Sequence, residues 1–104
     1  MSDQLTHADF QQRLHSLFRL QREGAEPVEL QLTEVSELKT TRRQEVFSIY
    51  FRGPGEFVLP QSVYRLEHET LGGSELFLVP IGRDSDGVTY EAVFNRLLPS
   101  SPAT

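Results

Sequence analysis

The apolar run in "SELFLVPIG", residues 74 to 82, constrains the fold of this chain more than any other feature. A strand with one face in water alternates apolar and polar residues, whereas a strand buried on both faces is apolar throughout. The run predicts a strand that is covered on both faces, by the sheet core on one side and by another element on the other. Its apolar side chains are Leu76, Phe77, Leu78, Val79 and Ile81.

Residues 6 to 18 carry the one convincing helical pattern. Thr6 is placed to cap the helix, and Asp9 stands three residues on, which is close to a capping box. Apolar residues then recur at helical spacing and form a single stripe. The stripe consists of Phe10, Leu14, Leu17 and Phe18. A short helix is marginal alone, so we expect this stripe to dock on the exposed side of the apolar strand.

The rest of the chain alternates with the period of two that is typical of half-buried strands. Gly and Pro residues punctuate these segments and predict short antiparallel connections. The alternation slips between Leu32 and Val35, which indicates either a β-bulge or the end of a strand. The inward positions are Val28, Leu30 and Leu32; Phe47, Ile49 and Phe51; Tyr64, Leu66 and His68; and Val88, Tyr90, Ala92 and Phe94.

Together these patterns predict an α+β fold: an N-terminal helix packed on a strongly bent antiparallel sheet, or small barrel, of five to six strands. A chain of 104 residues is large enough for one hydrophobic core. We expect a single domain over residues 1–96, followed by a flexible C-terminal tail over 97–104, where two prolines occur.

Composition excludes several classes of function. The absence of cysteine removes disulfides, thiolate nucleophiles and cysteine-based zinc sites. A net charge of −5 opposes phosphate binding, so we expect no nucleic-acid partner. The one basic cluster, Lys39, Arg42 and Arg43, is typical of a solvated loop. No signal sequence and no membrane-spanning run is visible, so we expect a cytoplasmic protein.

No complete catalytic or metal-binding set stands out. His68 lies between Glu67 and Glu69 and is interpreted as a partly buried histidine with a backbone partner, or alternatively as a general base or metal ligand. Asp84 and Asp86 precede a glycine but lack the further ligands of a calcium loop, so a hairpin turn is the better interpretation. We therefore predict no catalytic residues, no metal and no cofactor.

The blocks "FSIYFRGP", "LPQSVYRLEHETLG", "ELFLVPIG" and "YEAVFN" together resemble a family of small bacterial proteins that is known as a domain of unknown function. The resemblance covers roughly residues 5–96. It implies a genetic setting near phage-tail-collar-like genes and an accessory or assembly role. The family carries no established activity, cofactor or catalytic residues that the resemblance could transfer to this chain.

The leading hypothesis is a non-enzymatic domain that binds an unidentified protein partner, in a tail-like or fibre assembly. The partner-binding residues we predict are Tyr50, Arg52, Tyr64 and His68. Tyr50, Val63 and Val93 point away from the predicted core, so they are either covered by the helix or form an exposed apolar patch. The alternatives are a small-ligand-binding barrel and, less favoured, a hydrolytic enzyme that uses His68 and a carboxylate. The sequence carries no signal for an oligomeric state.

Overall fold

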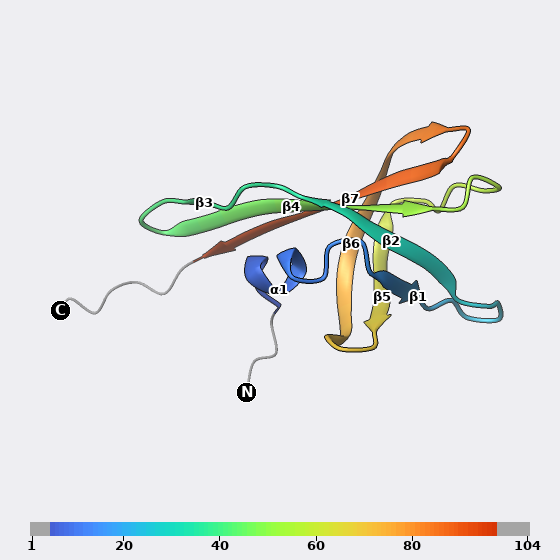
Figure 1. Cartoon of the computed structure of the whole chain (residues 1–104), viewed down its shortest axis with the longest axis horizontal. Coiled ribbons are helices and arrows are strands. Elements are labelled where there is room, and N and C mark those ends of the chain that lie inside the picture. Colours follow the sequence, from blue (N-terminus) through green and yellow to red (C-terminus); the bar gives the residue numbers. More distant parts are fainter. Residues whose placement is uncertain (1–4, 98–104) are drawn as a thin grey trace.

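The computed structural model describes residues 5–97, and strands dominate it (Figure 1). In chain order the elements are α1 (His7–Gln11), β1 (Leu17–Leu20), β2 (Val28–Val35), β3 (Lys39–Thr40), β4 (Gln44–Gly53), β5 (Ser62–His68), β6 (Gly72–Asp84) and β7 (Gly87–Leu97). The predicted tail begins at Leu97, which is the last residue of β7, and its other residues, 98–104, lie outside the described residues.

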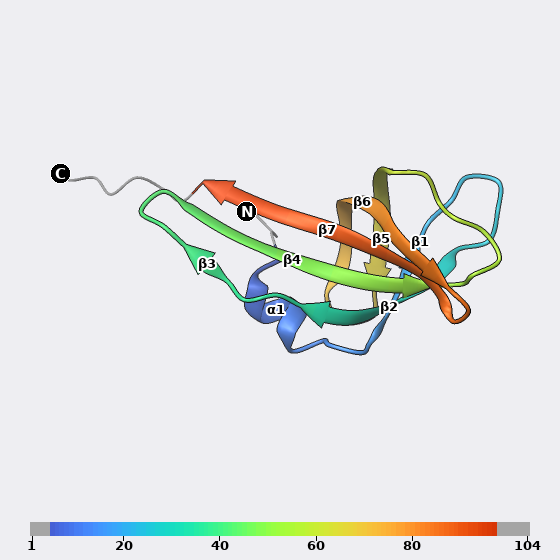
Figure 2. The same ribbon diagram turned by 90° about the horizontal axis from the view of Figure 1, so that it is seen from above.

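The strands form a closed antiparallel barrel. Their order is β2-β1-β5-β6-β7-β4, and a pairing of β2 with β4 closes the ring of six strands. The short β3 pairs with the outer end of β4 and is not part of the ring. Beyond the barrel, β4 and β7 continue as a long paired arm, which points away from the barrel in both views (Figures 1 and 2).

The predicted α+β class is wrong, because no substantial N-terminal helix forms: strands make up 59% of the structure and helix 5%. The capping box of Thr6 and Asp9 is present, but α1 ends after five residues at Gln11. The chain then turns through His15, which has a positive φ of 73°. The second half of the predicted stripe becomes β1, which pairs with β2.

The predicted role of the helix as a cover for residues 76–81 is also wrong. Along β6, Leu76 and Leu78 are buried, whereas Phe77 and Ile81 are each 51% exposed. The helix instead directs Phe10 into the core, where its ring lies 6.4 Å from that of Phe18 and 5.3 Å from that of Phe94. The apolar run is thus covered on one face only.

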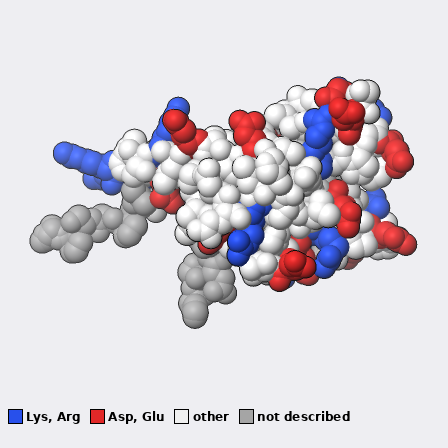
Figure 3. All heavy atoms as spheres, in the orientation of Figure 1, with Lys and Arg blue, Asp and Glu red and all other residues white. Residues whose placement is uncertain are grey.

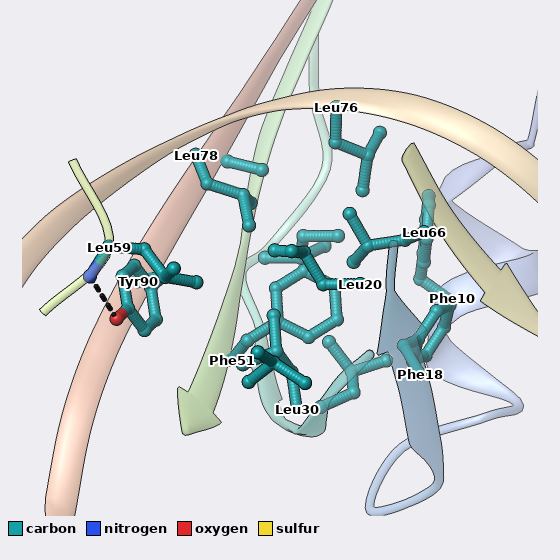
Figure 4. Packing of buried hydrophobic residues seen from close by; sticks show 14 of the residues in the cluster. Phe10, Phe18, Leu20, Leu30, Phe51, Leu59, Leu66, Leu76, Leu78 and Tyr90 are labelled. Carbon is teal, nitrogen blue, oxygen red and sulfur yellow. Dashed lines mark hydrogen bonds between the residues drawn. The ribbon is translucent and has the colours of Figure 1, made fainter. Parts of the chain in front are cut away.

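One hydrophobic core fills the inside of the barrel (Figure 4). Phe18 and Phe51 meet edge to face with centroids 5.2 Å apart, and Leu78 from β6 is fully buried among these side chains. The hydroxyl of Tyr90 accepts a hydrogen bond of 2.9 Å from the backbone N–H of Leu59, so this buried polar atom is satisfied. Fully burying such side chains stabilises the fold by about 1.5–3 kcal/mol each.

The predicted strand alternation is confirmed. The inward positions of β2, β4 and β7 are buried as the pattern requires, except that Phe94 is half-buried. The register between β2 and β4 shifts between Leu32 and Glu34, where the sequence indicated either a β-bulge or the end of a strand. The Lys39, Arg42 and Arg43 cluster lies exposed on the β3–β4 hairpin, where Figure 3 shows blue spheres at the tip of the arm. Among the described residues, no helix is long and apolar enough to cross a membrane.

Candidate interaction surface

The four predicted partner-binding residues divide between the two faces of the barrel wall. Tyr50 and Arg52 lie two residues apart on the outer face of β4, opposite Glu91 and Thr89 of β7. The hydroxyl of Tyr50 donates to Glu91 Oε2 at 3.0 Å, and Arg52 Nη1 donates to Thr89 Oγ1 at 3.0 Å. These cross-strand bonds tie both side chains to β7.

Hydrogen bonds and neighbouring charges shift the pKa values of side chains on the outer wall. The hydrogen bond to Glu91 is the main cause that raises the pKa of Tyr50, and partial burial adds to it. Arg52 forms an ion pair with Asp84, and the hydrogen bond from Arg52 lowers the pKa of the Asp84 carboxyl. These groups therefore keep their ordinary charges at neutral pH.

Tyr64 and His68 lie on the inward face of β5. The hydroxyl of Tyr64 donates to the carbonyl of Pro60, and burial raises the pKa of this phenol. His68 is only 7% exposed and its ring packs 4.5 Å from that of Phe18. The structure thus places this pair away from Tyr50 and Arg52, so the four residues do not form one site.

The hydrogen bonds of His68 fix its tautomer. The backbone N–H groups of Thr70 and Leu71 donate to Nδ1 at 3.0 and 3.1 Å, so in the neutral ring the proton is on Nε2. Nε2 then donates to Ser16 Oγ at 2.9 Å, and Ser16 donates to the Arg13 carbonyl. Burial, and then the charge of Arg13, lowers the pKa of His68.

This network has the wrong direction for nucleophilic catalysis. A serine nucleophile must give its proton to the imidazole, whereas here the imidazole donates to the serine. Both ring nitrogens are occupied, which is the pattern of a structural histidine that ties β5 to the turn before β1. The interpretation of His68 as a partly buried histidine with a backbone partner is confirmed. Its partner Ser16 carried no sequence signal of its own.

The Asp84–Gly87 segment is a two-residue hairpin between β6 and β7, as predicted. Asp84 accepts a hydrogen bond of 2.8 Å from the Asp86 N–H, which closes the turn locally. Between Leu5 and Leu97, no group of three or more His, Asp or Glu side chains is placed to hold a metal ion.

A hollow of about 930 Å³ lies on the surface of the barrel, lined mainly by residues of β1, β2 and the loops beside them. Its wall carries charges of both signs, including Arg19, Arg22, Glu26 and Glu29. The barrel interior itself is occupied by core side chains. This hollow is open and carries charged walls, so it differs from the mostly apolar, enclosed pocket that is the usual form of a small-ligand site.

The outer wall carries a group of apolar side chains, which we call the outer apolar face: Val63, Phe77 and Val93, which are exposed, and Val79, which is half-buried. Val63 and Phe77 are direct cross-strand partners, 59% and 51% exposed, and Val93 is 59% exposed. Val79 pairs with Glu91, which in turn pairs with Tyr50, so the face adjoins the predicted residue Tyr50. Sequence reasoning assigned Phe77 and Val79 to the core, because an apolar run alone does not tell which of its side chains are covered.

Beside the outer apolar face, the pairing of β6 with β7 comes to an end. β6 and β7 pair from the hairpin to Val79 and Glu91 and then diverge, with α1 in the angle between them (Figure 1). A cavity of about 380 Å³ lies in this angle. It is lined by Leu5, Phe10, Gly73, Ser74, Glu75, Leu76, Phe94 and Arg96. We call it the notch.

Comparison with known proteins gives one match. No curated protein and no solved structure is similar enough to the chain to count as a match. A family model described as "Domain of unknown function (DUF6916)" matches residues 5–94, which is most of the chain. The predicted membership of a domain-of-unknown-function family is confirmed: the chain belongs to the DUF6916 family.

Proposed function

We propose that this chain is a non-enzymatic protein-interaction domain that binds a partner protein through the outer apolar face. The observation that carries the proposal is the pair of Val63 and Phe77, two large apolar side chains that face each other across β5 and β6 with half or more of their surface in water. Contiguous exposed apolar side chains with a polar rim are typical of protein-binding surfaces.

The rim supplies directional groups beside the apolar centre. Tyr50 and Arg52 lie on β4 next to the Glu91 and Thr89 positions of β7, and their side chains are already ordered by hydrogen bonds. Tyr and Arg are enriched among residues that carry binding energy at interfaces. Side chains held in place before binding lose less entropy when a partner arrives.

The geometry favours this function over the other two candidates. A ligand-binding barrel needs an internal cavity, whereas sixteen buried hydrophobic side chains occupy the interior. A hydrolase built on His68 needs a ring nitrogen free to accept a proton from the nucleophile, whereas Nδ1 already accepts two backbone N–H groups.

We infer that the partner belongs to a tail-like or fibre assembly of a bacterium, in line with the family resemblance that the sequence blocks carry. The domain would act there as an accessory that docks onto a structural component. The compact wall of antiparallel strands is suited to this role because it presents a rigid face.

The experiment compares partner capture by matched variants. The tagged full chain is incubated with native lysate, the captured protein is identified and purified, and its affinity for the chain is measured directly. We expect Phe77→Ser and Val93→Ser to weaken this affinity by at least about tenfold, or 1.4 kcal/mol each. Leu38→Ser removes an apolar side chain that is 40% exposed outside the outer apolar face and serves as the control.

Equal affinity of the Phe77 and Val93 variants and the unmodified chain would overturn the proposed surface. A captured partner that belongs to no tail or fibre assembly would overturn the proposed setting and leave the surface intact.

A further inference from the structure

Among residues 5–97, the β7 strand has no partner on one edge along about half of its length. Its pairing with β4 runs from Gly53 and Val88 to Gln44 and Leu97 without a break. Its pairing with β6, in contrast, ends at Val79 and Glu91. Within the part of the chain that the structure describes, residues 92–97 therefore have a neighbouring strand on one side only.

The register shows which backbone groups face the free edge. The carbonyls of Ser48 and Gln44 on β4 accept bonds from Ser36 and Thr41, so even-numbered residues of β4 face away from β7 and odd-numbered ones face towards it. By the register of the ladder, Phe94 and Arg96 then bond to β4. The N–H and C=O groups of Val93, Asn95 and Leu97 point the other way, to the place that β6 has left.

The side chains around this place are suited to an extended peptide. On the inner side the notch offers apolar contacts with the half-buried side chains of Leu5 and Phe94. On the outer side stand Phe77 and Val93 of the outer apolar face. Successive residues of a strand point to opposite faces, so a peptide beside β7 would place alternate side chains in the notch and on the outer apolar face.

Charge adds a further preference. Two charged side chains line the notch: Arg96, which is paired with Glu45, and Glu75, which is exposed and, among the described residues, forms no ion pair. The whole chain carries a net charge of −5. A Lys or Arg in the peptide would therefore meet a complementary field beside β6.

We propose that the partner is recognised by strand addition: an extended segment of the partner protein, with alternating apolar side chains and a basic residue, pairs with the free edge of β7 at Val93 and Asn95. This inference rests on the proposed function and specifies how the same region binds. Unpaired strand edges are recurrent docking sites for extended peptides, because the main-chain hydrogen bonds supply affinity and alternate side chains supply specificity.

The first test is amide hydrogen exchange of the free, full-length chain, followed by NMR. The N–H groups of Glu91, Val93 and Asn95 all face the β6 side, but only Glu91 has a partner there. We expect Val93 and Asn95 to exchange at least about a hundredfold faster than Glu91 and Phe94, because only unpaired amides are open to solvent. Equal protection of Val93, Asn95 and Glu91 would overturn the free edge.

The second test uses a displayed library of random peptides of about seven residues, which in extended form cover the free edge. We expect selection on the immobilised chain to enrich peptides that alternate apolar residues and carry Lys or Arg. These peptides should slow the exchange of Val93 and Asn95 by at least about tenfold when bound.

The matched variants are Asn95→Pro, which removes the N–H that faces the free edge, and Asn95→Ala, which removes the same side chain and keeps the N–H. We expect binding of the selected peptides to fall at least about tenfold with Asn95→Pro and to stay within about twofold with Asn95→Ala. Failure to enrich any peptide, or equal loss in both variants, would overturn strand addition. Peptides that lose binding with Phe77→Ser but leave Asn95 unprotected would overturn strand addition and support the outer apolar face alone.

Discussion

The two faces of β6 carry almost the same chemistry and have opposite environments. Leu76 and Leu78 are 7% and 0% exposed and pack inside the barrel, whereas Phe77 and Ile81 on the same strand are each half exposed. Apolar character alone thus does not determine burial. A single-layer barrel wall has one inside, so the apolar side chains of its other face must stay in water or bind another molecule.

The inner face is best tested by Leu78→Ala, for which we expect the largest effect. Leu78 is fully buried in the core, so truncation loses its transfer free energy and leaves a cavity. We expect the free energy of unfolding, measured by urea titration, to fall by about 2–5 kcal/mol. A loss below about 1 kcal/mol would show that the inner face is not packed as described.

The hairpin that sets the register of β6 and β7 should be the next most sensitive point. Gly87 has a φ of 148°, and a Cβ there would overlap the carbonyl oxygen of Gly53. We expect Gly87→Ala to destabilise the fold by about 1–3 kcal/mol, because the backbone must shift in the left-handed region. Gly82→Ala is the control, since no atom lies within 4 Å of a Cβ at that position.

His68 extends the test to the inner face of the neighbouring strand β5. Burial lowers its pKa below the ordinary 6.5, so below about pH 6.5 the unfolded chain binds more protons than the folded one and stability falls. We expect the loss of unfolding free energy between about pH 7.5 and 5.5 to be larger in the unmodified chain than in His68→Gln, where this proton uptake is absent. Identical pH dependence of the two would mean that the ring is not desolvated. His7 and His15 are present in both chains and cancel.

The outer face should give the smallest change in stability. Phe77 is 51% exposed and contacts its cross-strand partner Val63. We expect Phe77→Ala to cost less than about 1 kcal/mol, which is the range of strand propensity and cross-strand pairing. A loss similar to that of Leu78→Ala would mean that Phe77 is buried after all, for example in an oligomer, and a dependence of stability on protein concentration would reveal it.

The strands could be predicted from the sequence because alternation records burial directly. Phe47, Ile49 and Phe51 follow a strict period of two and are all buried, and the slip after Leu32 marks the observed bulge. These patterns lie within single strands, and the burial of Phe47, Ile49 and Phe51 in the barrel follows them.

The helix could not be predicted in full because two patterns overlap. Phe18 fits the helical stripe of residues 6–18 and also the strand alternation with Leu20. Pairing of β1 with β2 is a long-range interaction and stabilises the strand more than one short helix can stabilise itself. The capping box at Thr6 therefore predicted the start of the helix correctly, but the helix ends at Gln11.

The candidate surface was only partly predictable. Tyr50 and Val93 were expected to point outward and do so. The exposure of Phe77 and the divergence of β6 from β7 depend on how the barrel bends, and no residue pattern in a single strand records that bend.

Thermal unfolding of two neighbouring variants, Leu78→Asp and Phe77→Asp, is the most direct test of the one-sided burial of β6. A charge at Leu78 would be buried without a partner, whereas a charge at Phe77 would lie on the outer wall. If β6 is covered on one face only, we expect only Leu78→Asp to abolish cooperative unfolding. Phe77→Asp should keep a sharp transition within a few degrees of the unmodified chain. Loss of cooperativity in both variants would contradict one-sided burial, since β6 would then be covered on both faces.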